Sequence, residues 1–247
     1  MGKHILTIVF LVLMLSLNPN KTNASERVVL LSIPSEVWHQ NVYLLADKKS
    51  WMEYENFTVQ IGDRGENIYN FPNWYHGKYD PALYKEDING DSLEDVIVVL
   101  NNYRAGIGNP LKDIHILNQI HDPYRRYYEA KIDPIRMAIK QNVKIEKNDN
   151  LVNIYIEEET FTIDITKCNF KNPRNPFFGF ELTEYNIENG LLIATVPAYV
   201  LRDDSVLGGY IGHLKVQYNW DGQAYIVKEI AFIKFTPEYN KHFITLY

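Results

Sequence analysis

The chain has 247 residues, of which 46% are hydrophobic and 13% aromatic, and it carries 25 Lys and Arg against 31 Asp and Glu. This length and composition suit one large globular domain or two small ones rather than a disordered protein. The formal charge of −6 argues against a nucleic-acid partner, which needs a basic face. Because Cys168 is its one cysteine, the chain cannot form an internal disulfide.

The N-terminus has the pattern of a secretory signal. Lys3 is followed by an uncharged apolar run at 5–17, which as a helix would span about 20 Å, short of the roughly 30 Å of a bilayer core. Small residues then predict cleavage after Ala24, so that 1–24 is a signal peptide; an uncleaved anchor is the alternative. We expect a secreted, extracellular protein with no membrane span after cleavage. Loss of Lys3 and Lys21 brings its formal charge from −6 to −8.

The first half of the mature chain consists of short apolar runs separated by turns. These runs predict strands at 28–33, 41–45, 56–61, 96–100 and 113–117. Phe57, Val59 and Ile61 alternate with polar residues and share one face of their strand. The stretch 70–81 mixes Pro and Gly with aromatic residues and is typical of a loop.

One short helix is predicted, with Asp133 as its N-cap and Pro134 as its first residue. Beyond it, paired runs predict antiparallel hairpins at 151–156 with 160–165, 180–187 with 191–200, and 213–218 with 224–235. The polar stretch 141–150 predicts a boundary between an N-terminal β region at 25–145 and a C-terminal hairpin region at 146–247, with one shared core as the alternative. The fold class is mainly β (α+β).

One loop carries a ligand pattern for a hard cation. Polar side chains stand at its positions 1, 3, 5 and 9, namely Asp87, Asn89, Asp91 and Asp95. With the backbone carbonyl of Leu93 at position 7, they supply the oxygen atoms that calcium prefers. Three carboxylates this close repel one another without a counter-charge. The sequence therefore predicts a calcium site, with a solvated Asp/Asn turn before the strand as the alternative.

The loop resembles the calcium loop of FG-GAP and VCBS-type repeats, in which Asp-x-Asn/Asp-x-Asp-Gly-x-x-Asp leads into an apolar strand, a glycine-bearing turn and a second strand. Here 87–95 leads into 96–100, a turn with Gly106 and Gly108, and the run 114–117. The resemblance implies a structural calcium ion on the five positions given above. More broadly, the chain is similar to small secreted proteins of Bacillus-type bacteria that carry one such loop and have no assigned activity.

Three features set this loop apart from other calcium loops. Its sixth position is Ser92, where those families usually have a glycine, and a left-handed serine costs about 1 kcal/mol. The loop occurs once, whereas a propeller needs a repeat in each blade, so a full propeller is not expected. Position 12 is Val98 rather than Glu, which excludes the helix–loop–helix form of calcium site.

Other chemistry-bearing residues have weaker patterns. The aromatic run 74–79 could stack on sugar rings, but core packing is the favoured interpretation. The run 124–128 mixes Arg and Tyr and is expected to be a surface segment. His115 lies on an apolar strand and is expected to pack there. Cys168 matches no cysteine-hydrolase signature and is expected to be an inert thiol.

The predicted function is therefore a secreted, calcium-stabilised β protein that acts as a binding or cell-surface-associated module. Its partner would be an extracellular ligand or a cell-surface polymer, and not nucleic acid. The sequence contains no known catalytic motif, which argues against an enzymatic function. A secreted hydrolase of wall polysaccharide or peptide is the alternative, because paired carboxylates leave no spacing rule in a sequence. A secreted inhibitor is a further alternative.

Overall fold

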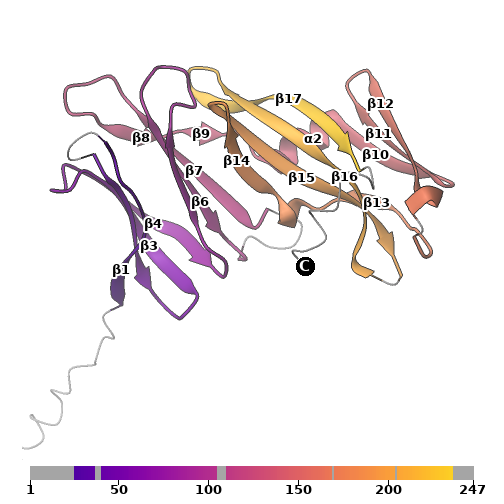
Figure 1. Ribbon diagram of the computed structural model, residues 1–247, viewed down its shortest axis with the longest axis horizontal. Coiled ribbons are helices and arrows are strands. Elements are labelled where there is room, and N and C mark those ends of the chain that lie inside the picture. Colours follow the sequence, from indigo (N-terminus) through magenta and orange to yellow (C-terminus); the bar gives the residue numbers. More distant parts are fainter. Residues whose placement is uncertain (1–24, 37–39, 105–109, 169, 204, 236–247) are drawn as a thin grey trace, which may run out of the picture.

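The computed structural model describes residues 25–36, 40–104, 110–168, 170–203 and 205–235. The predicted signal peptide at 1–24 lies outside these residues. The described part is mostly antiparallel β structure with one α-helix, as the sequence predicted (Figure 1). It forms four sheets and no closed propeller.

The first sheet is an antiparallel meander of four strands, β1–β2–β3–β4 in spatial order. Their bounds are β1 Glu26–Ile33, β2 Val42–Lys48, β3 Glu53–Ile61 and β4 Asn67–Gly77. Phe57, Val59 and Ile61 of β3 are all buried, as their alternation predicted. The sheet lies at the left of Figure 1, in indigo and purple.

The loop prediction for 70–81 is wrong for residues 70–77, which belong to β4. Pro72 has no N–H to donate, but β4 is an edge strand, where a missing donor is tolerated. The pairing register also shifts beside it, because Glu55 opposes Tyr75 whereas Phe57 opposes Phe71. This irregularity absorbs the extra residues of β4 and explains why the stretch lacks strand-like alternation.

A second antiparallel sheet has the spatial order β5–β6–β7–β8. Its strands are β5 Ala82–Glu86, β6 Asp95–Asn101, β7 Lys112–Gln119 and β8 Tyr127–Glu129. Every residue of β6 is buried, which agrees with its uninterrupted apolar sequence.

The largest sheet has the order β13–β15–β16–β17–β9, with β14 paired to another part of β15. The bounds are β9 Lys131–Ile132, β13 Pro176–Phe178, β14 Glu184–Glu188, β15 Leu191–Arg202, β16 Ser205–Trp220 and β17 Ala224–Lys234. A three-stranded sheet contains β10 Val143–Asn148, β11 Leu151–Ile156 and β12 Glu159–Asp164. Short 3₁₀ turns lie at Ile165–Cys168 and Phe180–Leu182. The three predicted C-terminal hairpins are present as β11–β12, β14–β15 and β16–β17. The prediction of a strand over 180–187 is wrong for 180–182, which form a 3₁₀ turn before β14.

The helix α2, Ile135–Asn142, starts one residue later than expected. Pro134 is its N-cap, and the predicted capping role of Asp133 is wrong. The Asp133 N–H instead donates to the carbonyl of Tyr225 at 2.9 Å, directly after the parallel pairing of β9 with β17. The polar stretch 141–150, expected to separate two regions, forms the end of α2 and the strand β10.

Two hydrophobic cores meet at β6. The small core lies between the first two sheets and consists of Val42, Leu44, Ala46, Phe57, Val59, Ile61, Trp74, Val96, Val98, Leu100, Leu117 and Tyr127. The large core takes in the other face of β6, with Ile97 and Val99, together with α2 and the buried residues of β11, β12 and β14–β17. Strand β6 therefore supplies side chains to both cores. No described helix is long and apolar enough to cross a bilayer.

A buried histidine ties the end of β4 to the end of β6. His76 is 1% exposed, and its Nδ1 accepts a hydrogen bond from the Asn101 N–H at 3.0 Å. Its Nε2 lies 2.8 Å from the carbonyl oxygen of Tyr79, so a neutral ring with hydrogen on Nε2 satisfies both contacts. Burial lowers the pKa of His76, which favours this neutral form.

Alanine substitutions on the two faces of β6 test whether both cores depend on this strand. Ile97 and Leu100 are fully buried in different cores. Each change to alanine should lower the free energy of unfolding by about 2–5 kcal/mol. Denaturant unfolding followed by circular dichroism should show one transition that both substitutions move. Two transitions, each moved by only one substitution, would contradict a common dependence on β6.

The His76→Gln substitution tests the buried histidine. Because the folded pKa lies below that of the unfolded chain, His76 contributes stability above about pH 6.5 that is lost as the pH falls through the folded pKa. The stability advantage of the wild type over His76→Gln should therefore be larger at about pH 7.5 than at about pH 5. Burial also lowers the pKa of His213, but that residue is present in both proteins and cancels in the difference. A difference independent of pH would contradict the assignment.

Candidate metal centre

The predicted calcium loop connects β5 to β6 and is held by its own side chains. The carboxylate of Asp87 accepts hydrogen bonds from the N–H groups of Gly90 at 2.7 Å and Ser92 at 2.8 Å. The Asn89 side chain accepts from the Asp91 N–H at 2.9 Å, and Asp91 accepts from the Leu93 N–H at 2.8 Å. The chain thus curls around its first carboxylate in a series of side-chain-to-backbone turns.

Two residues of the loop have left-handed backbone conformations. Gly90 has φ 81° and Ser92 has φ 69°. Glycine adopts this conformation freely, whereas serine is strained in it. Ser92 is the sixth position of the loop, where FG-GAP and VCBS-type loops usually have glycine.

The polar side chains of the loop converge. The Asn89 amide nitrogen lies 3.3 Å from a carboxylate oxygen of Asp91 and 3.4 Å from one of Asp95. The Asp87 carboxylate is hydrogen-bonded to the backbone on either side of Asp91, so three of the predicted ligand side chains are in contact and the fourth lies on the same turn. Leu93 contributes its N–H here, and the role of its carbonyl as a ligand stays a prediction.

Asp95 anchors the loop to the rest of the protein. It is 0% exposed and accepts hydrogen bonds from the N–H groups of Ile88 at 3.3 Å and Gln119 at 3.1 Å. The Tyr225 hydroxyl of β17 lies 3.5 Å from Asp95 Oδ2, the oxygen that also accepts from the Ile88 N–H. Burial raises the pKa of Asp95 to about 7, and the nearby carboxylates of Asp91 and Asp87 add to the shift, while the two backbone hydrogen bonds oppose it.

The surroundings of Asp95 include groups that the sequence pattern did not indicate. The Tyr225 hydroxyl also donates to the side-chain oxygen of Asn118 at 2.9 Å. Asn118 is 1% exposed, and its amide nitrogen has no hydrogen-bond partner among the described residues. The turn at Gly190 packs on the loop so closely that a Cβ there would lie 3.2 Å from the carbonyl oxygen of Asp87. These contacts come from distant segments, so local spacing could not have revealed them.

The donor set suits a hard divalent cation in chemistry, because all of its candidate atoms are carboxylate, amide or carbonyl oxygens. The positions of these oxygen atoms do not form a complete coordination sphere. Among the described residues, no three His, Cys, Asp or Glu side chains stand in metal-binding geometry. The oxygens of Asp87 and Asp91 face backbone N–H groups instead. A carboxylate has lone pairs for both partners, so these hydrogen bonds are compatible with ligation after a small rearrangement.

The other residues considered from the sequence lie mostly in packed positions. Trp74 is 7% exposed and stacks between Phe71 and His115, each with a ring-centroid distance of 3.8 Å. The Nδ1 of His115 lies 2.9 Å from a carboxylate oxygen of Glu129. Tyr79, by contrast, is 74% exposed.

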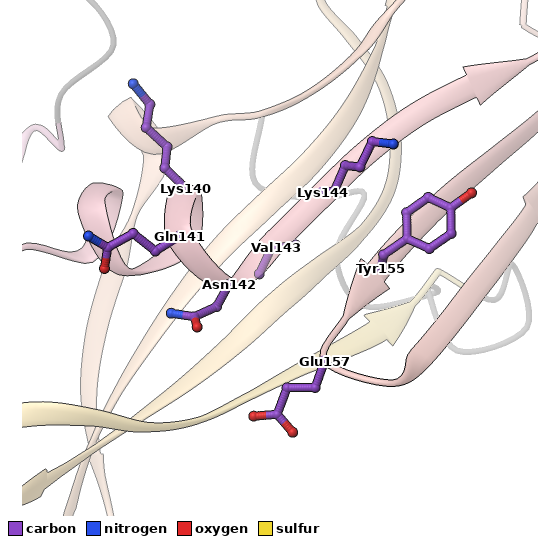
Figure 2. Close-up of a pocket in the computed structure, with 7 residues that line it drawn as sticks. All are labelled: Lys140, Gln141, Asn142, Val143, Lys144, Tyr155 and Glu157. Carbon is purple, nitrogen blue, oxygen red and sulfur yellow. The ribbon is translucent and has the colours of Figure 1, made fainter.

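Two cavities are candidate ligand sites. One, of about 350 Å³, lies beside the end of α2 and is lined by Lys140, Gln141, Asn142, Val143, Lys144, Tyr155 and Glu157 (Figure 2). Its charged ends point away from one another, with the two lysine amines on one side and the Glu157 carboxylate on the other (Figure 2). The second, of about 220 Å³, is lined by Gln40, Ile61, Glu66, Asn67, Pro123, Tyr124, Arg125 and Tyr127. Each has one carboxylate in its lining.

Comparisons with protein-family models, with curated proteins and with solved structures find no match to this chain.

Substitutions of Asp95 test its role as the anchor of the loop. Asp95→Ala leaves the N–H groups of Ile88 and Gln119 without their acceptor and should lower the free energy of unfolding by about 2 kcal/mol or more. Asp95→Asn keeps one acceptor oxygen and removes a buried charge, so it should cost clearly less. Denaturant unfolding in chelator measures both. Equal tolerance of Ala and Asn would show that the carboxylate does not anchor the loop.

Proposed function

We propose that this chain is a secreted β protein that is stabilised by one calcium ion and serves as a binding or cell-surface-associated module. The observation that supports the calcium proposal is the contact of the Asn89 side chain with both Asp91 and Asp95, on a loop whose backbone curls around the Asp87 carboxylate at the entrance to β6. Secretion rests on the signal-like sequence at 1–24, and calcium is abundant outside cells.

The ion would act as a structural brace. It would offset the mutual repulsion of three carboxylates, one of which is buried at the start of a strand shared by both cores. The same loop contacts β7 through Gln119 and β17 through Tyr225. Calcium bound here would therefore stabilise the junction of two sheets, and no catalytic step is assigned to it.

A binding role is favoured by the distribution of aromatic and charged groups. Large aromatic side chains are exposed on turns, with Trp51 80%, Tyr79 74% and Tyr124 76% exposed. Exposed aromatic rings are characteristic of recognition surfaces. Neither of the two cavities has a second carboxylate in its lining, which a paired-carboxylate hydrolase would use. A secreted hydrolase of wall polysaccharide or peptide is the alternative proposal, and a secreted inhibitor is a further one.

Calcium dependence of thermal stability tests the proposal. With a dissociation constant near 0.1 mM, about 1 mM calcium should add about 1.4 kcal/mol to the free energy of unfolding. For a chain of this size, that corresponds to a rise in Tm of about 3–6 °C. Scanning fluorimetry of the mature chain in calcium and in chelator measures the change, and calorimetric titration should give about one site per chain.

Matched charge-removing variants provide the control. Asp91→Asn alters an exposed loop ligand and should abolish the calcium-dependent rise while leaving the Tm in chelator within a few degrees. Glu86→Gln removes the same charge from an exposed position just outside the loop and should keep the full response. If the wild type melts alike in calcium and in chelator, the proposal fails.

A further inference from the structure

The turn between β7 and β8 is held in one shape by its own hydrogen bonds. The Asp122 carboxylate accepts from the N–H groups of Tyr124 at 3.0 Å and Arg126 at 3.1 Å, and it pairs with the Arg126 guanidinium. A backbone hydrogen bond of 2.9 Å from the Ile120 N–H to the Arg126 carbonyl closes the turn. Arg125 has φ 50°, a left-handed conformation that arginine seldom adopts. The turn therefore presents Tyr124 and Arg125 from a fixed backbone.

This turn is joined to the start of β4, in the first sheet. The Asn67 amide nitrogen donates to the carbonyl of Tyr124 at 3.4 Å. The Tyr127 N–H donates to the hydroxyl of Tyr69 at 2.8 Å, and the rings of these two tyrosines meet edge to face with a centroid distance of 6.2 Å. The β3–β4 and β7–β8 turns thus meet at one end of the small core. The cavity of about 220 Å³ is lined by residues of both turns.

The apolar part of this cavity consists of a buried floor and an exposed ring. Ile61 and Tyr127 are 5% and 7% exposed and belong to the small core. Tyr124 is 76% exposed, so its ring stands at the rim. A tyrosine ring exposed in this way offers an apolar face to a flat ligand that lies over the floor.

The polar part of the lining consists of planar groups that both position and recognise hydroxyl groups. These side chains are Gln40, Glu66, Asn67 and Arg125. The Arg125 side chain is exposed and forms no hydrogen bond or ion pair with any described residue, so its five donors are available. Glu66 uses one carboxylate oxygen to accept from the Arg64 N–H at 2.9 Å. One carboxylate and one guanidinium leave the lining without net formal charge.

We propose that this cavity binds one pyranose unit of a neutral polysaccharide, of the glucose or N-acetylglucosamine type. In such rings the hydroxyl groups are equatorial, so the C–H faces are free to stack on Tyr124 while the edge reaches Arg125 and the amides. The inference names the ligand class for the proposed binding role and rests on that role. The cavity is smaller than the roughly 300–1,000 Å³ that drug-sized ligands need, which suits a single ring. Because Tyr124 stands at the rim, that ring can belong to a longer chain.

Other classes of ligand match the lining less well. An ionic ligand favours walls of one charge, whereas here Glu66 and Arg125 cancel. An apolar peptide anchor favours apolar walls, whereas half of the lining residues are polar or charged. A polyhydroxylated neutral ring uses both parts of the cavity.

One wall of the cavity is connected to the calcium loop. The Tyr127 hydroxyl donates to the Gln119 side chain at 3.0 Å, and the Gln119 N–H donates to Asp95 at 3.1 Å. Sugar binding is therefore measured both in calcium and in chelator. The calcium proposal is judged by the shift in Tm alone, so binding without a calcium effect, or a calcium effect without binding, separates the two failures.

Saturation-transfer NMR with defined oligosaccharides tests the inference. The probes are cellohexaose, made of glucose, and chitohexaose, made of N-acetylglucosamine. At least one of them should receive saturation from the mature chain, with a dissociation constant on the order of 1 mM, as expected for a small ligand held at one site. The affinity should be nearly independent of salt, because neither probe is charged.

Substitutions at the cavity provide the decisive comparison. Tyr124→Ala should weaken binding at least about tenfold, whereas Tyr124→Phe keeps the stacking face and should retain most of the affinity. Arg125→Gln removes the guanidinium and should weaken binding about tenfold. The matched control is Tyr79→Ala, which removes a ring that is 74% exposed on the β4–β5 connection and should bind like the wild type. Thermal melting checks that each variant is folded, which is expected because these side chains are exposed.

Four results would overturn the inference. The first is no saturation transfer to either oligosaccharide, in calcium and in chelator alike. The second is unchanged affinity in both Tyr124→Ala and Arg125→Gln. The third is a loss in Tyr79→Ala as large as the loss in Tyr124→Ala. The fourth is tighter binding of an anionic polymer, polygalacturonate, than of both neutral probes.

Discussion

The burial of β6 on both faces is the constraint on which the rest of the structure depends. A strand that is apolar throughout must be covered from both sides, and here different sets of sheets cover each side. The small core packs on Val96, Val98 and Leu100, and the large core on Ile97 and Val99. Each core is therefore completed by side chains of the same strand. The polar groups at both ends of this strand, Asp95 and the Asn101–His76 pair, are held in place by that packing.

The local sequence was a good guide where periodicity and turn chemistry act over short distances. The Asn189–Gly190 turn has positive φ at both residues, as a two-residue hairpin requires, and the β14–β15 pairing follows it directly. It was a poor guide where tertiary packing decides. The β4 strand contains Pro72 and lacks alternation, and it is recognisable only once its position at the edge of a sheet is known.

The same distinction holds for the candidate site. The spacing of Asp87, Asn89, Asp91 and Asp95 predicted that these side chains would share a loop, because they lie within nine residues. The spacing could not predict that Asp95 would be buried in contact with the Tyr225 hydroxyl and would accept a hydrogen bond from the Gln119 N–H, since those partners come from other strands. The sequence also could not predict that Trp51 and Tyr79 would be exposed, because other aromatic residues of the same types, such as Trp74 and Tyr127, are buried in the small core.

The contact between Asp95 and Tyr225 has a consequence for how the molecule folds. The two residues are separated by 130 positions in the chain. Closing so large a loop is slow, and proteins dominated by such non-local pairings fold slowly. A chain emerging from its N-terminal end would therefore hold the polar entrance of β6 uncovered until β17 arrives, so the β16–β17 hairpin covers a carboxylate that was synthesised more than a hundred residues earlier.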